Sequence, residues 1–480
     1  MSEPETNSPW LPKPFGQWRI SLLILGAISL TGCASFSEDG GFGVVQQTTA
    51  ERLGKDVRWA RTMQDRNEIA ERVTDLLARP LTIDNAVQVA LLNNRGLQAT
   101  FDSLGITEAE RVQAGRLPNP GFSFGKNKRG DEREIERGFH VNLARLIFMP
   151  TILKLETRRL EQAQGDVAMR VLDLAAQTRK AWVEAVSGRE SALYMNKVKR
   201  TADVGAQLAR RMAKVGNFSK LQQAREQSFY AEATLNQARA ENAALAARER
   251  LTRLLGLYGD QARYELPERL PSLPETPEQY PNAVKIALAQ RLDVQAAKTG
   301  VERLAGNLGM VKTNRFINVL ELGSLYNTSN EEPKQTGWEI ELELPIFDWG
   351  DAKVARADAM YRQAMNQAAQ TAIDARSEVR QAYAGYRSAF DIAAHYRDEI
   401  VPLSKRISEE NLYRYNGMMI GVFELLADAR AQIGAVDGYI EALKDFWMAK
   451  TDLDMAMIGK PSLTAMPGAQ MSADTGGADH

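Results

Sequence analysis

The sequence lacks most of the side chains on which enzymatic chemistry depends. Its 480 residues include one Cys, three His and only 7% aromatic residues. A single Cys excludes a disulfide within the chain, and no HExxH, CxxC, GxGxxG or Walker-type glycine loop occurs. Because the sequence contains no nucleophile–base pair and no set of metal ligands, it predicts no enzyme, no catalytic residue, no metal site and no cofactor.

An excess of charge of one sign is also missing. The 60 Lys and Arg residues balance the 61 Asp and Glu residues, which argues against a dedicated nucleic-acid-binding protein. Long hydrophobic runs are absent as well. The apolar run at residues 20–30 falls well short of the roughly 20 residues that a membrane-spanning helix needs.

This short apolar run has the length and the basic flank of a signal peptide. It ends in the sequence LTGCA at residues 30–34, which resembles a bacterial lipoprotein signal in which the Cys is acylated and becomes the first mature residue. We therefore expect residues 1–32 to be a signal peptide and Cys33 to be the lipidation site. Ala34, rather than Asp, after the Cys indicates the outer membrane. An ordinary free or buried Cys is the alternative.

The remainder of the chain contains two copies of one unit. The segment NAVQVAL at residues 85–91 matches NAVKIAL at residues 282–288, an offset of 197 residues. Three later landmarks keep their order while the offset drifts to 203. These pairs are 146–148 with 345–347, 214–216 with 415–417, and 254–256 with 457–459. An ordered, duplicated match of this kind predicts a tandem structural repeat.

Each copy has the same predicted elements: a first helix, two strands, a very long helix and a return helix. Hydrophobic residues recur with a period of two in the strands and about every seven residues in the first long helix. The predicted first helices are 82–115 and 281–312, the strands 121–127, 138–148, 316–327 and 337–347, and the long helices 151–214 and 351–415. The fold class is therefore mainly α with a small β part.

These elements define the predicted domains. A lipid-anchored extension at 33–80 contains an amphipathic helix at about 50–77, which we expect to pack outside the helical repeats. The repeats cover 81–259 and 281–460, and a Pro-rich linker at 260–280 joins them. The tail at 461–480, rich in Ala, Gly and Ser, is predicted to be disordered. Charged Lys126, Lys128 and Arg129 predict that the first strand ends early, so that the first hairpin is the shorter one.

The strand WEIELELPIF at residues 338–347 has one apolar face and one acidic face, which carries Glu339, Glu341 and Glu343. Its length suits a transmembrane strand of about 9–11 residues, although a soluble sheet would show the same alternation. Four strands cannot close a barrel, and open sheet edges are not tolerated in lipid. A trimer would supply twelve strands and an open lumen.

The duplicated order of elements resembles the TolC-like outer membrane efflux protein family, in its lipoprotein branch. The resemblance is carried by ALLNN at 90–94, PNP at 118–120, LPIFDWGDAKVARA from residue 344 and YNGMMIGVFELLADAR at 415–430, with KVGNFSKLQQAR as the weaker first copy of the last. It implies a homotrimer with a twelve-stranded β-barrel in the outer membrane and an α-helical tunnel in the periplasm. It also implies a periplasmic adaptor (membrane fusion) protein and an inner-membrane pump, often of the resistance-nodulation-division type, as partners.

The expected working residues follow from this arrangement. Three copies of Glu339, Glu341 and Glu343 would line the barrel lumen and favour cations, with a merely solvated strand face as the alternative. Glu424 and Asp428, one helical turn apart, are candidates for a periplasmic gate, with solvated surface charges as the alternative. The residues at the two helical turns are candidates for adaptor docking because they expose apolar side chains. These are Val215, Gly216, Gly417, Met418, Met419 and Ile420.

Met418 and Met419 also suggest a soft-metal contact, although adjacent Met residues are more often flexible packing. The predicted function is a passive outer-membrane exit channel for small solutes, such as drugs or metal ions, extending into the periplasm. The competing prediction is a lipid-anchored periplasmic coiled-coil or adaptor protein that conducts nothing. The substrate is not encoded in the sequence, because the pump and the adaptor select it.

Overall fold

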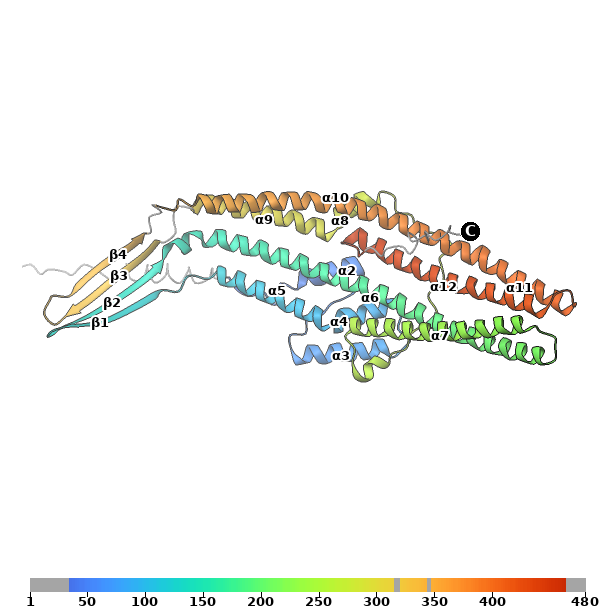
Figure 1. The fold of residues 1–480 in the computed structure, drawn as a ribbon. Helices are drawn as coiled ribbons and strands as arrows, with labels where there is room; N and C mark the ends of the chain where they lie inside the picture. The colour runs from blue at the N-terminus through green and yellow to red at the C-terminus, as the bar shows by residue number, and fades with distance from the viewer. Residues whose placement is uncertain (1–33, 315–319, 343–346, 463–480) are drawn as a thin grey trace, which may run out of the picture. The chain divides into compact units, whose positions relative to one another are not determined.

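The computed structural model describes residues 34–314, 320–342 and 347–462, and its ribbon is drawn in Figure 1. The predicted signal peptide, Cys33, Glu343 and nearly all of the tail lie outside these residues. The chain divides into two compact units. The first contains the residues up to Gly40, Ile106–Leu160 and Ala305–Asp358, and the second contains Gly41–Gly105, Glu161–Leu304 and the residues from Ala359 on.

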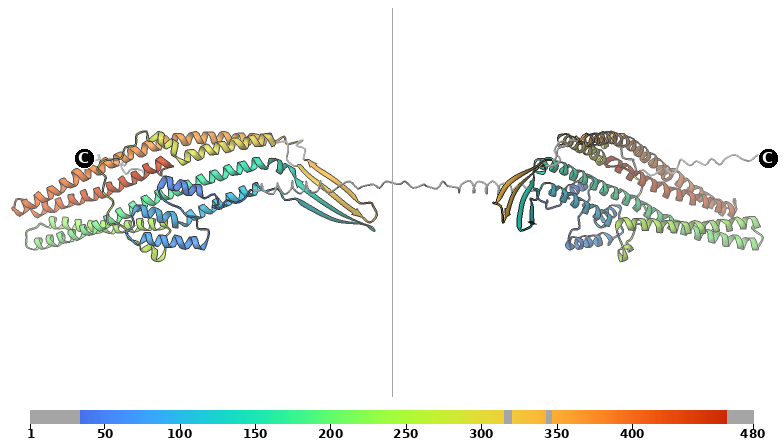
Figure 2. Two further views of the ribbon diagram at one scale, coloured as in Figure 1. Left: turned by 180° about the vertical axis from the view of Figure 1, so that it is seen from behind. Right: turned by 60° about the vertical axis from the view of Figure 1, so that its left-hand side comes forward.

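The first unit contains a four-stranded antiparallel sheet in the order β1-β2-β3-β4. The strands are β1 (Gly121–Arg129), β2 (Glu132–Asn142), β3 (Leu320–Ser329) and β4 (Gln335–Leu342). Each repeat contributes one hairpin, and the two hairpins join through the pairing of β2 with β3. The four predicted strands are therefore present, and they form one continuous sheet (Figure 2).

The predicted bounds of the first two strands are wrong. The first strand continues through its three basic residues to Arg129, because Gly130, at φ 64°, begins a two-residue turn that keeps the hairpin paired up to Arg129 and Glu132. The first hairpin is therefore not cut short. The second strand runs from Glu132 to Asn142 rather than from residue 138 to residue 148. The Asn142 side chain accepts a hydrogen bond from the backbone N–H of Arg145, and a helix begins at Leu143.

The helices follow the predicted order in both repeats. The first repeat contains α4 (Ile83–Asn93), α5 (Arg95–Ala114), α6 (Leu143–Lys214) and α7 (Lys220–Leu255). The second contains α8 (Ala283–Gln290), α9 (Leu292–Asn314), α10 (Asp351–His395), α11 (Val401–Asn416) and α12 (Val422–Ile458). A π-helical turn, Tyr396–Ile400, separates α10 from α11, so the second long helix is not regular throughout.

The first helix of each repeat is broken at one residue, which the sequence did not predict. Asn94 and Arg291, which are 197 residues apart, both leave the helical region, with ψ angles of 117° and 125°. Each break residue donates a hydrogen bond to the last turns of its own repeat's return helix. Asn94 donates to the carbonyl of Leu254 at 2.9 Å and Arg291 to that of Ala456 at 3.4 Å. The duplication is therefore visible in three dimensions.

The N-terminal extension forms two helices, α2 (Gly43–Leu53) and α3 (Met63–Leu77), where the sequence predicted one. Gly54 ends α2 in the left-handed conformation at φ 61°, and a capping box between Thr62 and Asp65 starts α3. Ile69 and Val73 of α3 belong to the hydrophobic core of the second unit. These two helices therefore belong to that unit.

The core of the second unit is built around Trp182, Leu251, Tyr386 and Phe446, which come from α6, α7, α10 and α12. The linker at 260–280 is docked on this core through buried Leu266, Leu270 and Leu273. No helix within the described ranges is long and apolar enough to cross a membrane.

Candidate functional site

The sheet has one apolar face and one polar face, which its register defines. Residues that pair directly across an antiparallel ladder project to the same side. Phe122, Phe139, Ser324 and Trp338 are aligned across the four strands, as are Val141, Leu322 and Ile340 across three. The opposite face carries Gly121, His140, Gly323 and Glu339 in one row.

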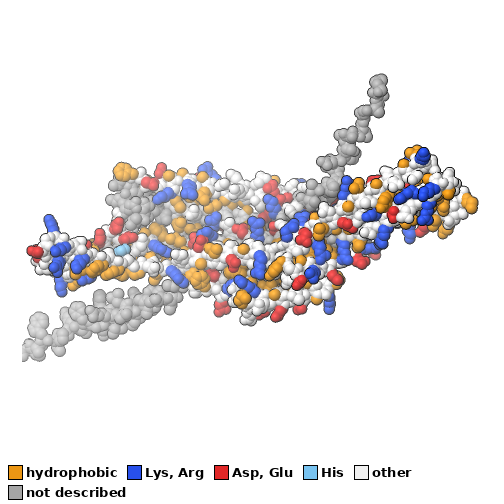
Figure 3. Space-filling view, turned by 60° about the horizontal axis from the view of Figure 1, so that its bottom comes forward, with side chains coloured by type: hydrophobic (Ala, Val, Ile, Leu, Met, Phe, Trp, Pro, Cys, Tyr) orange, Lys and Arg blue, Asp and Glu red, His pale blue; other side chains and the backbone are white. Residues whose placement is uncertain are grey.

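The apolar face is exposed in the single chain. Trp338 is 74% exposed, Phe122 69% and Phe124 61%. Ile340 and Leu342 add to the same face at 53% and 50%. Hydrophobic side chains form a band along the strands in Figure 3. A contiguous exposed apolar surface of this kind marks contact with lipid or protein.

The polar face carries most of the carboxylates of the sheet. Glu339 and Glu341, predicted to line a lumen, both lie on it and are exposed. Glu321 lies directly opposite Glu341, and Glu136 of β2 is on the same face. Sequence reasoning missed Glu321 because β3 alternates poorly, with Leu325 also on the polar face. The acidic surface therefore extends over three strands.

The two helical turns of the second unit lie side by side in both views, one between α6 and α7 and the other between α11 and α12 (Figure 2). Their apolar residues are strongly exposed: Met418 is 94% exposed, Met419 72% and Val215 71%. Gly216 has a φ of 78°, and Met418 has the unusual value of 60° for a residue with a side chain. Gly417 caps α11, and Ile420 is half-buried. The predicted docking residues are therefore gathered at neighbouring turns.

The two gate candidates are in different environments. Glu424 is exposed in the first turn of α12. Asp428 is half-buried, and its carboxylate accepts a hydrogen bond from the Asn411 side chain of α11. Asp428 thus ties the two helices of its own hairpin together, so of the two only Glu424 is an open surface charge.

An ion pair near these turns, with a buried carboxylate and a half-buried arginine, was not predicted. Glu226 of α7 is 1% exposed, and its Oε1 lies 2.6 Å from Nη2 of Arg430 on α12. The guanidinium group also stacks 4.4 Å from the centre of the Phe229 ring. No local pattern indicates this pair, because its members are 204 residues apart in the chain.

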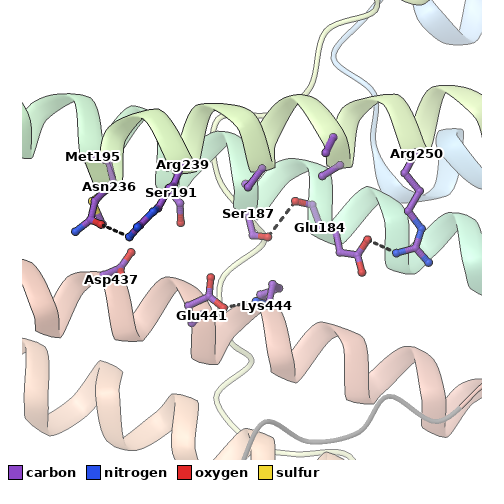
Figure 4. A pocket seen from close by; sticks show the side chains of 15 residues that line it. Glu184, Ser187, Ser191, Met195, Asn236, Arg239, Arg250, Asp437, Glu441 and Lys444 are labelled. Carbon is purple, nitrogen blue, oxygen red and sulfur yellow. Dashed lines mark hydrogen bonds and ion pairs between the residues drawn. The ribbon is translucent and has the colours of Figure 1, made fainter. Parts of the chain in front are cut away.

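A polar groove of about 760 Å³ lies between α6, α7 and α12 (Figure 4). Glu184, Asp437 and Glu441 contribute carboxylates to it, and Arg250 and Lys444 are paired with Glu184 and Glu441. Burial raises the pKa of Asp437, and Glu441 raises it further, whereas Lys444 lowers it. The groove has no arrangement for covalent chemistry. Within the described ranges, no group of three or more His, Cys, Asp or Glu residues is placed to hold a metal ion.

Comparison with known proteins supports the fold. No family model matches the chain. A curated relative, the cobalt-zinc-cadmium resistance protein CzcC of Cupriavidus metallidurans, is 25% identical over 274 residues, which are 56% of this chain and 64% of CzcC. The chain thus spans slightly less than two thirds of this relative.

Three solved structures are similar in fold. They are the CmeC outer membrane channel of Campylobacter jejuni, the outer membrane protein VceC of Vibrio cholerae, and CusC, a transmembrane channel by its description. Their TM-scores are 0.67, 0.66 and 0.65, with identities of 16%, 15% and 16%. The matches cover 88%, 79% and 78% of this chain and 92%, 96% and 92% of the respective structures.

The fold is that of the outer membrane channel proteins, with a small antiparallel sheet and long paired helices. More particularly, it is the fold of the TolC-like outer membrane efflux family, and the resemblance predicted from the sequence is confirmed.

Proposed function

We propose that the chain is the outer-membrane exit channel of a tripartite efflux system, passively conducting small solutes. The observation that supports this most directly is the two-faced sheet, whose exposed aromatic face suits lipid and whose acidic face suits water. Three chains would close a barrel of twelve strands, with the acidic faces turned to the lumen. The edges β1 and β4, left unpaired in one chain, would pair between neighbours.

The proposed channel also gives roles to Cys33, to the two helical turns and to Glu424. Cys33 would carry the lipid anchor after removal of residues 1–32. The neighbouring turns, with exposed Val215, Met418 and Met419, would dock a periplasmic adaptor that connects to an inner-membrane pump. Glu424 would face the tunnel at its periplasmic end as the charged element of a gate.

Cations are the solutes that the polar face would favour. In a trimer, Glu321, Glu339 and Glu341 would each be present three times on the lumen wall, which lowers the energy of a cation there. The name of the relative CzcC refers to resistance to cobalt, zinc and cadmium, three metal cations. We therefore include metal cations among the proposed solutes.

Single-channel recording in planar bilayers tests the proposal. The mature lipoprotein is expected to form trimers that give discrete, cation-favouring openings. Changing Glu339, Glu341 and Glu343 to Gln should reduce the selectivity, whereas Glu331→Gln in the β3–β4 loop serves as the matched control. Unchanged selectivity would show that the carboxylates of the acidic strand do not determine which ions pass. A protein that neither forms trimers nor conducts would favour the lipid-anchored coiled-coil alternative.

A further inference from the structure

A second pocket, of about 410 Å³, lies in the first unit where the hairpin β1–β2 meets its helices. Its apolar wall includes Phe36, Val112 and Leu117, and its cationic side chains are Arg116 and Arg145. Phe36 and Leu117 remain 56% and 44% exposed. No carboxylate lines the pocket among the described residues, so its formal charge is positive.

The side chains of the two arginines have no partner among the described residues. Neither the Arg116 nor the Arg145 side chain makes a hydrogen bond or an ion pair with any described residue. The neighbouring Arg111 and Arg159, by contrast, are paired with Glu108 and Glu110. Two unpaired guanidinium groups beside apolar side chains form a surface suited to a ligand with an anionic head and an apolar body.

The pocket lies next to the start of β1 and the end of β2. Leu117 lies four residues before β1, which begins at Gly121, and Arg145 lies three residues after the end of β2. Gly121 pairs with His140, so both strand ends lie at the same end of the sheet. If the apolar face of the sheet spans the bilayer, this end lies at the headgroups of the periplasmic leaflet.

The start of the described chain is held at the same place. The backbone N–H of Ala34 donates to the carbonyl of Gly115 at 3.4 Å, and Arg111 donates to the carbonyl of Ser35 at 3.4 Å. A Cβ on Gly115 would lie 2.5 Å from the Ala34 Cβ, so only Gly permits this approach. Ala34 follows the predicted lipidation residue directly. The described residues that follow the predicted anchor therefore lie beside the arginine pocket, whose wall includes Phe36.

We propose that this pocket binds the phosphate headgroup of an anionic glycerophospholipid of the periplasmic leaflet. Arg116 and Arg145 contact the phosphate, and the first part of an acyl chain lies on Phe36 and Leu117. An anionic lipid is preferred over a zwitterionic one because the pocket offers no carboxylate to an ammonium group. The inference rests on the proposed outer-membrane function.

Native mass spectrometry of the full-length protein in detergent tests this site. With added phosphatidylglycerol, one strongly retained lipid per chain is expected, and phosphatidylcholine should be retained less. The double variant Arg116→Gln/Arg145→Gln should weaken retention by about tenfold or more, since two charge-assisted contacts are lost. The matched control is Lys128→Gln/Arg129→Gln, which removes two charges from the far end of the same hairpin.

Three results would overturn the inference: equal retention by the double variant and the wild type, equal loss in the control, or displacement of the lipid by inorganic phosphate at comparable concentration. The last result would indicate a free-anion site. Bilayer recording on the same preparations separates the two proposals. If the double variant conducts and retains lipid as well as the wild type does, only the proposed lipid site is contradicted. If the wild-type protein never conducts, the proposed channel function is contradicted.

Discussion

Glu226 and Arg430 join the two helical hairpins of one chain, with 2.6 Å between the carboxylate and the guanidinium group. The Glu226 side chain is 2% exposed and that of Arg430 29%. Because α7 and α12 belong to different repeats, this pair is a direct link between the two copies near their turns.

Removing the charge of Glu226 is expected to loosen this link. Glu226→Gln should lower the free energy of unfolding by about 1–3 kcal/mol, because Arg430 loses its charged partner but retains some contact with water. A double-mutant cycle with Arg430→Gln, followed by urea unfolding, measures the coupling. Glu232→Gln, at an exposed position on the same helix, is the control. A coupling energy near zero would contradict the link.

The orientation of the sheet can be tested with Trp338. This side chain is 74% exposed on the apolar face, so bromine-labelled lipids should quench its fluorescence in reconstituted protein. Because the chain has seven Trp residues, a variant is needed to assign the quenching to one of them. Trp338→Phe should reduce the quenched fraction substantially. Trp59→Phe is the control, because Trp59 packs against Phe42 in the second unit. If Trp338→Phe left quenching unchanged, the apolar face would not contact lipid.

Asp437 is expected to weaken the fold when it is charged. Its raised pKa, caused first by burial, means that the folded state binds the proton more tightly than the unfolded state does. Asp437→Asn should therefore raise the Tm at neutral pH. The gain should shrink as the pH falls through the raised pKa toward 3.8, the ordinary value.

The comparison for this experiment is Asp391→Asn, at an exposed position on α10. Thermal unfolding from pH 4 to pH 8 follows both variants. A Tm gain for Asp437→Asn that is the same at every pH would show that the charge is not the cause.

Arg291 has the largest fully buried side chain among the described residues. Its side chain is 1% exposed, and its Nη2 lies 2.7 Å from Asp293 Oδ2 and 2.6 Å from Glu378 Oε2. Arg291→Gln leaves the Glu378 carboxylate without a cation, so we expect a loss of about 3–5 kcal/mol of unfolding free energy. Adding Glu378→Gln should recover part of this loss.

The control for Arg291 is Arg303→Gln, which removes a single contact with Gln162 in the same unit. Chemical unfolding of the detergent-solubilised protein gives both free energies. Similar losses for the two variants would mean that the buried charges at the helix break are not linked.

The repeat, the order of the elements and the position of the strands were predictable because they depend on local hydrophobic periodicity and on turn residues. The matched landmarks at 254–256 and 457–459, for example, contain Gly256 and Gly459, which directly follow the two return helices. The breaks at Asn94 and Arg291 were not predicted from the sequence, because both are stabilised by hydrogen bonds to a distant helix. The break at Asn94 also has a local component, because the Asn94 side chain accepts a hydrogen bond from the backbone N–H of Leu97.

The candidate site was predictable in part for the same reason. Glu339 and Glu341 stand out through the alternation of their own strand, which is local information. Glu321 joins them only through the register of β3 with β4, and Glu226 meets Arg430 only through the packing of two repeats. Neither relationship leaves a pattern in a single stretch of sequence.

The pairing of β2 with β3 also constrains the order in which the protein can form. Glu134 in β2 pairs with Ser329 in β3, a residue made much later in synthesis. The β2 edge of the β1–β2 hairpin therefore stays unpaired, and its apolar face stays exposed, until the second repeat has been synthesised. Assembly of the sheet is thus a late step, and a chaperone that covers the β1–β2 hairpin until then would protect it from aggregation.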